Sequence, residues 1–128
     1  MSTRSRIAVA QDDGSVKSIY CHFDGYPAYN GKMLMQNYNS KSLADALVAM
    51  GDMSALDVDI EQSTFYNRDR GEELNVSIDE TKEQFVEAFV DDIFEEYAYL
   101  YTDGEWVCYV GGNSTAVPIA EAVKNDQD

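Results

Sequence analysis

The chain has 128 residues, 45% of them hydrophobic, and a formal net charge of −15 at pH 7. A chain of this length can bury one core without disulfides or metals, and its apolar content excludes a disordered protein. We therefore expect one domain over residues 1–128, with frayed ends at residues 1–3 and 124–128.

The chain contains no apolar run near the roughly 18 residues that span a bilayer, and its first residues lack the apolar stretch of a signal peptide. These features favour a cytoplasmic protein that makes no membrane contact. Cys21 and Cys108 are then expected as reduced thiols. With two cysteines and one histidine, a structural zinc site is not expected, and neither is another cofactor.

The negative charge is unevenly distributed along the chain. Residues 1–56 contain five basic and five acidic residues, whereas residues 57–128 contain 4 basic and 19 acidic residues. This asymmetry predicts a one-sided acidic surface, which excludes direct binding to a nucleic-acid backbone through that surface and permits a basic protein partner. The alternative is that the charge serves solubility alone.

The first half of the chain alternates between strand, turn and helix patterns. Asp13-Gly14 is typical of a hairpin turn and separates predicted strands at 6–11 and 16–22. Glycine and proline then indicate an ordered loop at 23–31, followed by a short helix at 32–38. A clearer helix is predicted at 42–50, with Ser42 as its N-cap and Gly51 at its end. Its expected apolar stripe is Leu43, Ala46, Leu47 and Met50.

The second half contains the strongest helix and hairpin signals. Residues 52–64 are ambiguous, and residues 65–78 suggest two strands broken near Arg70-Gly71, with Leu74, Val76 and Ile78 pointing inward. Ser77 and Glu80 fit a capping box before a helix at 79–96. Strands at 97–101 and 105–110 flank Asp103-Gly104, and a short helix follows at 115–123. The pattern predicts an α+β fold in which antiparallel β-hairpins pack with about three helices.

Two motifs resemble a family of small proteins of tailed bacteriophages and prophages. The motifs are Ser-Thr-Arg-Ser-Arg-Ile at residues 2–7 and Ile-Tyr-Cys-His-Phe-Asp-Gly-Tyr-Pro at residues 19–27. The segment Arg68-Asp69-Arg70-Gly71-Glu72 and the closing aromatic hairpin are similar to later landmarks of that family. The resemblance implies a phage setting in a bacterial host cell and carries over no activity and no catalytic residue.

The sharpest candidate site is an acidic ridge on the predicted helix at 79–96. Glu83, Glu87, Asp91 and Glu95 lie four residues apart, and Glu80 flanks them. Successive members rise about 6 Å along the helix axis, a spacing comparable to that of backbone phosphates. The functional hypothesis is that this ridge mimics nucleic acid for a basic host protein. The alternative is a solvated helix face.

The arginines form a second constellation, because all four occur in two Arg-x-Arg pairs. In a strand, residues two apart share a face, so each pair could present two guanidinium groups to one phosphate. The candidate ligand-binding residues of this hypothesis are Arg4, Arg6, His22, Asp24, Tyr26, Arg68 and Arg70. The alternative is that the arginines pair with some of the 24 acidic residues.

Catalytic and metal patterns are weaker. Cys21 and His22 face opposite ways in a strand and cannot form a dyad, whereas His22 and Asp24 could orient one another for general-base work. Asp57, Asp59 and Glu61 alternate and could hold a hard cation such as magnesium, although a polar strand face or loop is the favoured interpretation. No catalytic residue is therefore assigned.

Two function hypotheses follow. The first is an acidic interaction protein, a phage-encoded inhibitor or decoy for a nucleic-acid-handling host protein. Such a protein could act against a host defence, including a CRISPR system. The second is a binding protein or hydrolase for a nucleotide or another phosphorylated ligand. A continuous acidic face favours the first, and a hollow where both arginine pairs converge favours the second. The sequence leaves the oligomeric state open, a homo-oligomer included.

Overall fold

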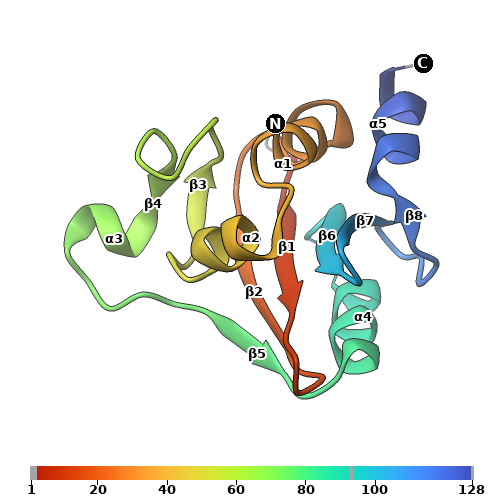
Figure 1. Cartoon of the computed structure of the whole chain (residues 1–128), viewed down its shortest axis with the longest axis horizontal. Coiled ribbons are helices and arrows are strands. Elements are labelled where there is room, and N and C mark those ends of the chain that lie inside the picture. The colour runs from red at the N-terminus through yellow and green to blue at the C-terminus, as the bar shows by residue number, and fades with distance from the viewer. Residues whose placement is uncertain (1–2, 93, 128) are drawn as a thin grey trace.

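The computed structural model describes residues 3–92 and 94–127, and its framework is one mixed sheet. The strands are β1 (Ser5–Ala10), β2 (Val16–Cys21), β3 (Met53–Ala55), β4 (Thr64–Phe65), β5 (Ser77–Asp79), β6 (Tyr97–Thr102), β7 (Glu105–Val110) and β8 (Val117–Pro118). Their order is β4-β3-β2-β1-β6-β7-β8, and β5 pairs with the edge of β2 that also meets β3 (Figure 1).

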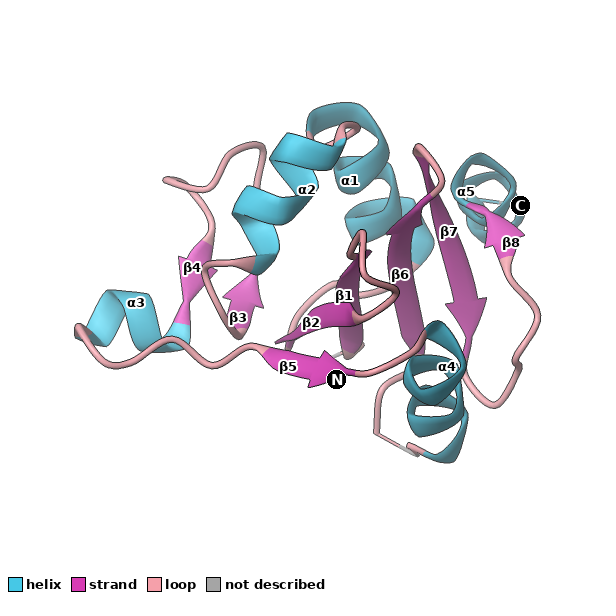
Figure 2. Ribbon diagram, turned by 60° about the horizontal axis from the view of Figure 1, so that its bottom comes forward, coloured by secondary structure: helices cyan, strands magenta, loops and turns pink. Residues whose placement is uncertain are grey.

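Helices occupy both faces of the sheet. They are the π-helix η1 (Pro27–Gly31) and the α-helices α1 (Lys32–Asn37), α2 (Lys41–Val48), α3 (Tyr66–Arg70), α4 (Lys82–Asp91) and α5 (Ile119–Gln127). Helices α1 and α2 lie on one side of the sheet and α4 lies on the other (Figure 2). The prediction of an α+β fold is confirmed. The described residues form five α-helices rather than about three, and the hairpins join in one sheet.

The sheet joins two hairpins through a parallel pair. The β1–β2 and β6–β7 hairpins are antiparallel, as their turn signals predict. Strand β1 also pairs in parallel with β6, from Ser5 opposite Tyr97 to Val9 opposite Tyr101. Asp103 and Gly104 both have positive φ, 52° and 82°, which is the backbone that a two-residue hairpin turn requires. The turn signals therefore identified the hairpins, while the parallel pairing is not visible in local patterns.

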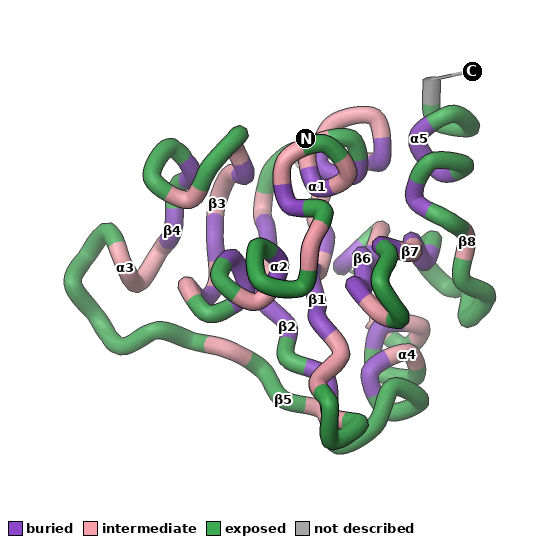
Figure 3. Tube along the Cα trace, in the orientation of Figure 1, coloured by how far each residue is buried: buried purple, intermediate pink, exposed green. Residues whose placement is uncertain are grey.

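Alternation along the strands divides the core in two. Ile7, Ile19 and Tyr99 face a large cluster that α1, α2 and α5 complete. The opposite face carries a smaller cluster, which consists of Tyr109 and small or aliphatic strand residues and is covered by α4; its buried helix residues are Phe85 and Phe89. Figure 3 shows the burial along β1 and β2, in contrast to the exposed segment between α3 and β5. The burial of this second face of the sheet thus depends on helix α4.

The predicted cap and buried face of helix α2 are wrong. Helix α2 has Ser40 rather than Ser42 as its N-cap, so Ala44, Leu47 and Val48 are buried. Leu43, expected in the stripe, is 46% exposed, and Ala46 is exposed as well. The sequence offers two serines two residues apart, and only packing against the sheet decides between them.

The segment at 65–78 does not form the expected strand pair. It contains β4, helix α3 and an extended connection to β5, and Leu74 and Ile78 are exposed rather than inward-pointing. Gly71 follows α3 with a φ of 71°, a left-handed conformation that suits glycine and ends the helix. The expected loop at 23–31 likewise contains the π-helix η1.

The expectation of frayed ends stays a prediction, and the structure gives both ends contacts where it describes them. The Thr3 carbonyl accepts a hydrogen bond from Gly25 N, and Lys124 lies within helix α5. Asp126 accepts a hydrogen bond of 2.8 Å from Ala28 N, which ties α5 to η1. Residues 1, 2 and 128 lie outside the described residues.

We predict that Phe89→Ala destabilises the protein by about 3–5 kcal/mol, because this 2%-exposed side chain is central to the cluster under α4. Glu87→Gln, on the exposed side of the same helix, is the control and should change stability by no more than about 0.5 kcal/mol. Urea unfolding curves measure both. The reverse order would contradict the register of α4 against the sheet.

Candidate functional site

Helix α4 presents an acidic outer face. Thr81 is its N-cap, since the Thr81 hydroxyl accepts a hydrogen bond of 3.1 Å from Gln84 N. With Phe85 and Phe89 turned to the sheet, Glu83, Glu87 and Asp91 are exposed. We call these three residues the acidic ridge. None of them forms an ion pair with a described residue.

The start of α4 differs from the prediction. Ser77, the expected cap, lies in β5, and Glu80 is exposed just before the helix. Thr81 and Gln84 take the places expected for Ser77 and Glu80, but the Gln84 side chain accepts from Glu80 N, the residue before the N-cap, over 3.0 Å and not from Thr81 N. Glu80 therefore flanks the acidic ridge without belonging to the helix.

The fourth expected member of the ridge, Glu95, is not on the helix. Helix α4 ends at Asp91, and the Asp92 side chain accepts hydrogen bonds from Phe94 N and Glu95 N, at 2.7 and 3.2 Å. This turn sends the chain back toward β6. Glu95 is 5% exposed and its carboxylate accepts from Arg6 Nε, at 3.1 and 2.9 Å. The prediction of an exposed Glu95 is wrong.

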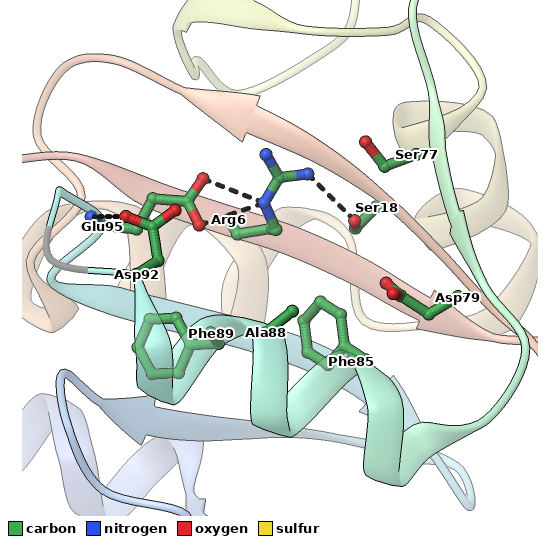
Figure 4. A pocket seen from close by; sticks show the side chains of 9 residues that line it. All are labelled: Arg6, Ser18, Ser77, Asp79, Phe85, Ala88, Phe89, Asp92 and Glu95. Atoms are coloured by element: carbon green, nitrogen blue, oxygen red, sulfur yellow. Dashed lines mark hydrogen bonds and ion pairs between the residues drawn. The ribbon is translucent and has the colours of Figure 1, made fainter.

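Arg6 lies at a small hollow between the sheet and α4 (Figure 4). The hollow has a volume of about 210 Å³, and Arg6 Nη1 also donates to Ser18 Oγ over 3.0 Å. Its other lining residues are Ser77, Asp79, Phe85, Ala88, Phe89, Asp92 and Glu95. One guanidinium therefore faces three carboxyl groups, a balance that disfavours a phosphate or another anion.

The second arginine pair has a structural role. Arg68 Nη1 and Nη2 donate to the carbonyls of Ile60 and Ser63, each over 2.8 Å, and its guanidinium stacks on Phe65 at 4.5 Å. Arg68 Nε donates to Asp69 over 2.8 Å. Arg68 thus holds the loop before β4 in place.

The arginine pairs do not converge. Arg70 is exposed on α3, which lies at one end of the molecule while α4 lies toward the other (Figures 1 and 2). Because Arg68 and Arg70 are in a helix, the same-face rule for strands does not apply to them. Arg4 precedes β1 and lies beside the Phe94 ring, with its guanidinium carbon 6.0 Å from the ring centroid. The alternative interpretation, in which the arginines form ion pairs with acidic residues, holds for Arg6, Arg68 and Arg70.

The remaining candidate ligand residues lie near the end of β2. The strand ends at Cys21, so alternation no longer places His22 and Asp24 on one face. Tyr20 Oη and His22 Nδ1 are 2.7 Å apart, and Asp24 is exposed with a φ of 57°. Tyr26 lies beside Tyr29, with 6.5 Å between ring centroids.

The alternating acids at 57–61 form a turn. Asp59 accepts hydrogen bonds from the side chain and backbone of Gln62, which lower the pKa of its carboxyl group. Asp57 accepts from Val58 N over 2.7 Å. Within residues 3–92 and 94–127, no group of three or more His, Cys, Asp or Glu side chains is placed to hold a metal ion.

The acidic half of the sequence occupies both ends of the molecule, so a one-sided acidic surface is only partly correct. Residues 57–74, which surround α3, contain six acidic and two basic residues. Residues 75–128 contain 13 acidic and 2 basic residues, a net charge of −11, and form α4, α5 and their neighbours. The strongly acidic end is therefore the end that carries the acidic ridge.

An apolar groove beside this end was not visible in the sequence. It consists of two hollows of about 490 and 210 Å³, which share Tyr97 and Val110 in their walls. Val90 lines the first, and Val117 and Ala122 line the second. Local hydrophobicity could not reveal the groove, because these residues come from α4, β6, β7, β8 and α5.

Comparison with protein-family models, with curated proteins and with solved structures found no match for this chain. Among the described residues, no helix has both the length and the apolar character needed to cross a membrane. These comparisons therefore contribute nothing to the functional assignment.

We predict that Glu95 titrates above its ordinary pKa of 4.5, because burial raises its pKa more than Arg6 lowers it. A raised folded-state pKa gives stability that is complete below the unfolded pKa and is lost as the pH rises through the folded pKa. Glu95→Gln should remove this part of the pH dependence of unfolding, whereas the exposed control Glu87→Gln should retain it. Carboxyl NMR titration and urea unfolding at several pH values test this. A midpoint for Glu95 below 4.5 would contradict it.

We also predict that both thiols are free but inert in the folded protein. Cys21 and Cys108 are buried and unbridged, and burial raises their pKa values to about 11 and about 12. Because thiolate is the reactive species, a disulfide reagent should label neither residue quickly until the protein is denatured, and then label both. Rapid labelling without denaturant, or recovery of a Cys21–Cys108 disulfide, would overturn this prediction.

Proposed function

We propose that this protein acts by binding a positively charged protein partner through the acidic ridge on α4. The observation that carries the proposal is that Glu83, Glu87 and Asp91 are exposed, four residues apart, and without an ion pair to any described residue. A solvated helix normally intersperses acids with lysine or arginine, which stabilises it. Helix α4 contains one basic residue, Lys82, at its first position.

The ridge carries an electrostatic cost that a partner can relieve. Like charges four residues apart destabilise a helix by roughly 0.2–0.5 kcal/mol per pair, and the ridge contains two such pairs. A basic surface would remove this repulsion on binding. The field of the acidic end would also attract such a surface from a distance and accelerate association.

Nucleic-acid mimicry is the form of binding that we favour. Carboxylates about 6 Å apart along a helix resemble a run of backbone phosphates, so the surface that accepts them is one that handles nucleic acid. In the phage setting that the sequence resemblance implies, that partner is a nucleic-acid-binding protein of the host, and the chain is its inhibitor or decoy.

Binding of a phosphorylated ligand has weaker support. The two arginine pairs point to different regions, and Arg6 is neutralised by Glu95. Arg68 is committed to two backbone carbonyls. No described hollow combines the two pairs.

We predict that the triple variant Glu83→Gln, Glu87→Gln, Asp91→Asn keeps the fold and loses partner binding. A partner is captured from host lysate, and binding kinetics are then measured at two salt concentrations. The triple variant should associate at least about tenfold more slowly at low salt, with a smaller change in dissociation, since exposed charges chiefly set association rates. Duplex DNA should compete with the parent protein for the partner.

The matched control removes three exposed acids at the other end of the molecule, by Glu61→Gln, Glu72→Gln and Glu73→Gln. It changes the net charge equally, so it should lower the association rate much less. Equal effects of both variants would show that net charge alone matters. Unchanged binding of the ridge variant would leave solubility as the role of the ridge.

A further inference from the structure

We infer that the apolar groove beside the acidic ridge binds an apolar side chain of a basic peptide segment on the partner protein. This inference deepens the proposed function and rests on it, because it names the chemistry that the partner presents. The groove is the pair of adjacent hollows that share Tyr97 and Val110 in their walls.

The groove has an exposed apolar floor. Val110, at the end of β7, is 46% exposed, and Val90, Tyr97 and Val117 are each half-buried around it. These four side chains form the apolar surface that an apolar side chain of a partner would cover.

Two glycines keep the groove open. Gly111 and Gly112 follow Val110 and line the larger hollow without a side chain. Gly111 N donates to the Glu96 carbonyl over 2.7 Å, and a β-carbon on Gly111 would lie 3.1 Å from that carbonyl oxygen. That contact is tighter than most real β-carbon contacts, and Gly112 has a φ of 80°, a left-handed conformation that side chains rarely adopt.

The rim of the groove is acidic. Asp92 and Glu96 line the larger hollow and Asp126 lines the smaller, and none of the three forms an ion pair with a described residue. No lysine or arginine among the described residues lines either hollow. Burial, together with the charges of Asp126 and Glu96, raises the pKa of Tyr97, which keeps its phenol neutral.

This combination selects one occupant. An apolar floor inside a carboxylate rim is complementary to a segment that carries an aliphatic or aromatic side chain between lysines or arginines. A second copy of this chain is disfavoured, because each copy has a net charge of −15 and would bring further carboxylates to the rim. The groove adjoins the end of α4, so one basic segment could contact the acidic ridge and place its apolar side chain in the groove.

The test uses two capped peptides of equal charge, Lys-Lys-Leu-Leu-Lys-Lys and Lys-Lys-Ser-Ser-Lys-Lys, titrated into the full-length protein and followed by NMR. The leucine peptide should bind about tenfold more tightly, as expected for burial of one aliphatic side chain. It alone should shift the signals of Val90, Tyr97, Val110 and Val117. The double variant Val110→Thr, Val117→Thr, which keeps the side-chain shape, should abolish the difference between the peptides and retain binding of the serine peptide.

The control is Ile78→Thr, which removes an exposed aliphatic side chain from β5, outside the groove, and should leave the preference for leucine intact. Equal binding of the two peptides with shifts confined to α4 would overturn the groove while leaving the acidic ridge as a binding site. Failure of both peptides to bind would overturn the proposed function and the groove together. Leu43 and Val58 line a separate hollow beside α2, and leucine-dependent shifts there would also overturn the groove as the binding site. Concentration-dependent dimerisation that Val110→Thr removes would overturn it as well, because the occupant would then be a second copy of the chain.

Discussion

The parallel pairing of β1 with β6 is the constraint on which the rest of the structure depends. It brings together strands separated by some 90 residues and makes β1 the centre of the sheet, with β2 on its other edge. Parallel pairing requires a long crossover, and here the crossover contains α1 to α4. Because paired residues share a face, this register places Ile7 with Tyr99 against the large cluster and Ala8 with Leu100 under α4.

The same register explains the Arg6–Glu95 pair and the length of α4. Glu96 N donates to the Arg4 carbonyl over 2.8 Å, which extends the contact just ahead of β6. The chain must therefore leave α4 early enough to reach this position, and Asp92 supplies the turn. A buried ion pair adds little net stability, but a shifted register would leave one charge buried without its partner. The Arg6–Glu95 pair thus favours a single register of β1 against β6, at the expense of a fourth exposed acid.

Features that depend on neighbouring residues, such as turns and helix faces, could be predicted from the sequence. Features that depend on contacts between distant residues could not. Asp13-Gly14 and Asp103-Gly104 mark hairpins through local features, namely positive φ at Gly14, Asp103 and Gly104 and hydrogen bonds from Ser15 to the Asp13 side chain. Three of the four acids expected on the ridge are exposed because the apolar stripe at Phe85 and Phe89 determines which side of the helix faces solvent. Glu95 continues the same spacing, but spacing cannot show where a helix ends. We expected a strand at Arg68 and Arg70, but the structure has helix α3 there. Arg68 holds this helix against the loop before β4 through the carbonyls of Ile60 and Ser63, contacts that a local pattern does not reveal.

The placement of charge and apolar surface argues for binding over solubility. Acidic residues contribute to solubility wherever they lie on the surface. If solubility were their only role, acids dispersed over the surface would serve equally well and would avoid the repulsion between acids four residues apart on one helix. Here the first 56 residues are neutral, and the segment from residue 75 onward carries a net charge of −11. That segment also contributes most of the walls of the apolar groove. Long-range charge chiefly sets how fast partners meet, whereas buried apolar contacts chiefly set how long they stay together. An acidic ridge adjoining an apolar groove supplies both, because the ridge attracts a basic partner and the groove buries its apolar side chain.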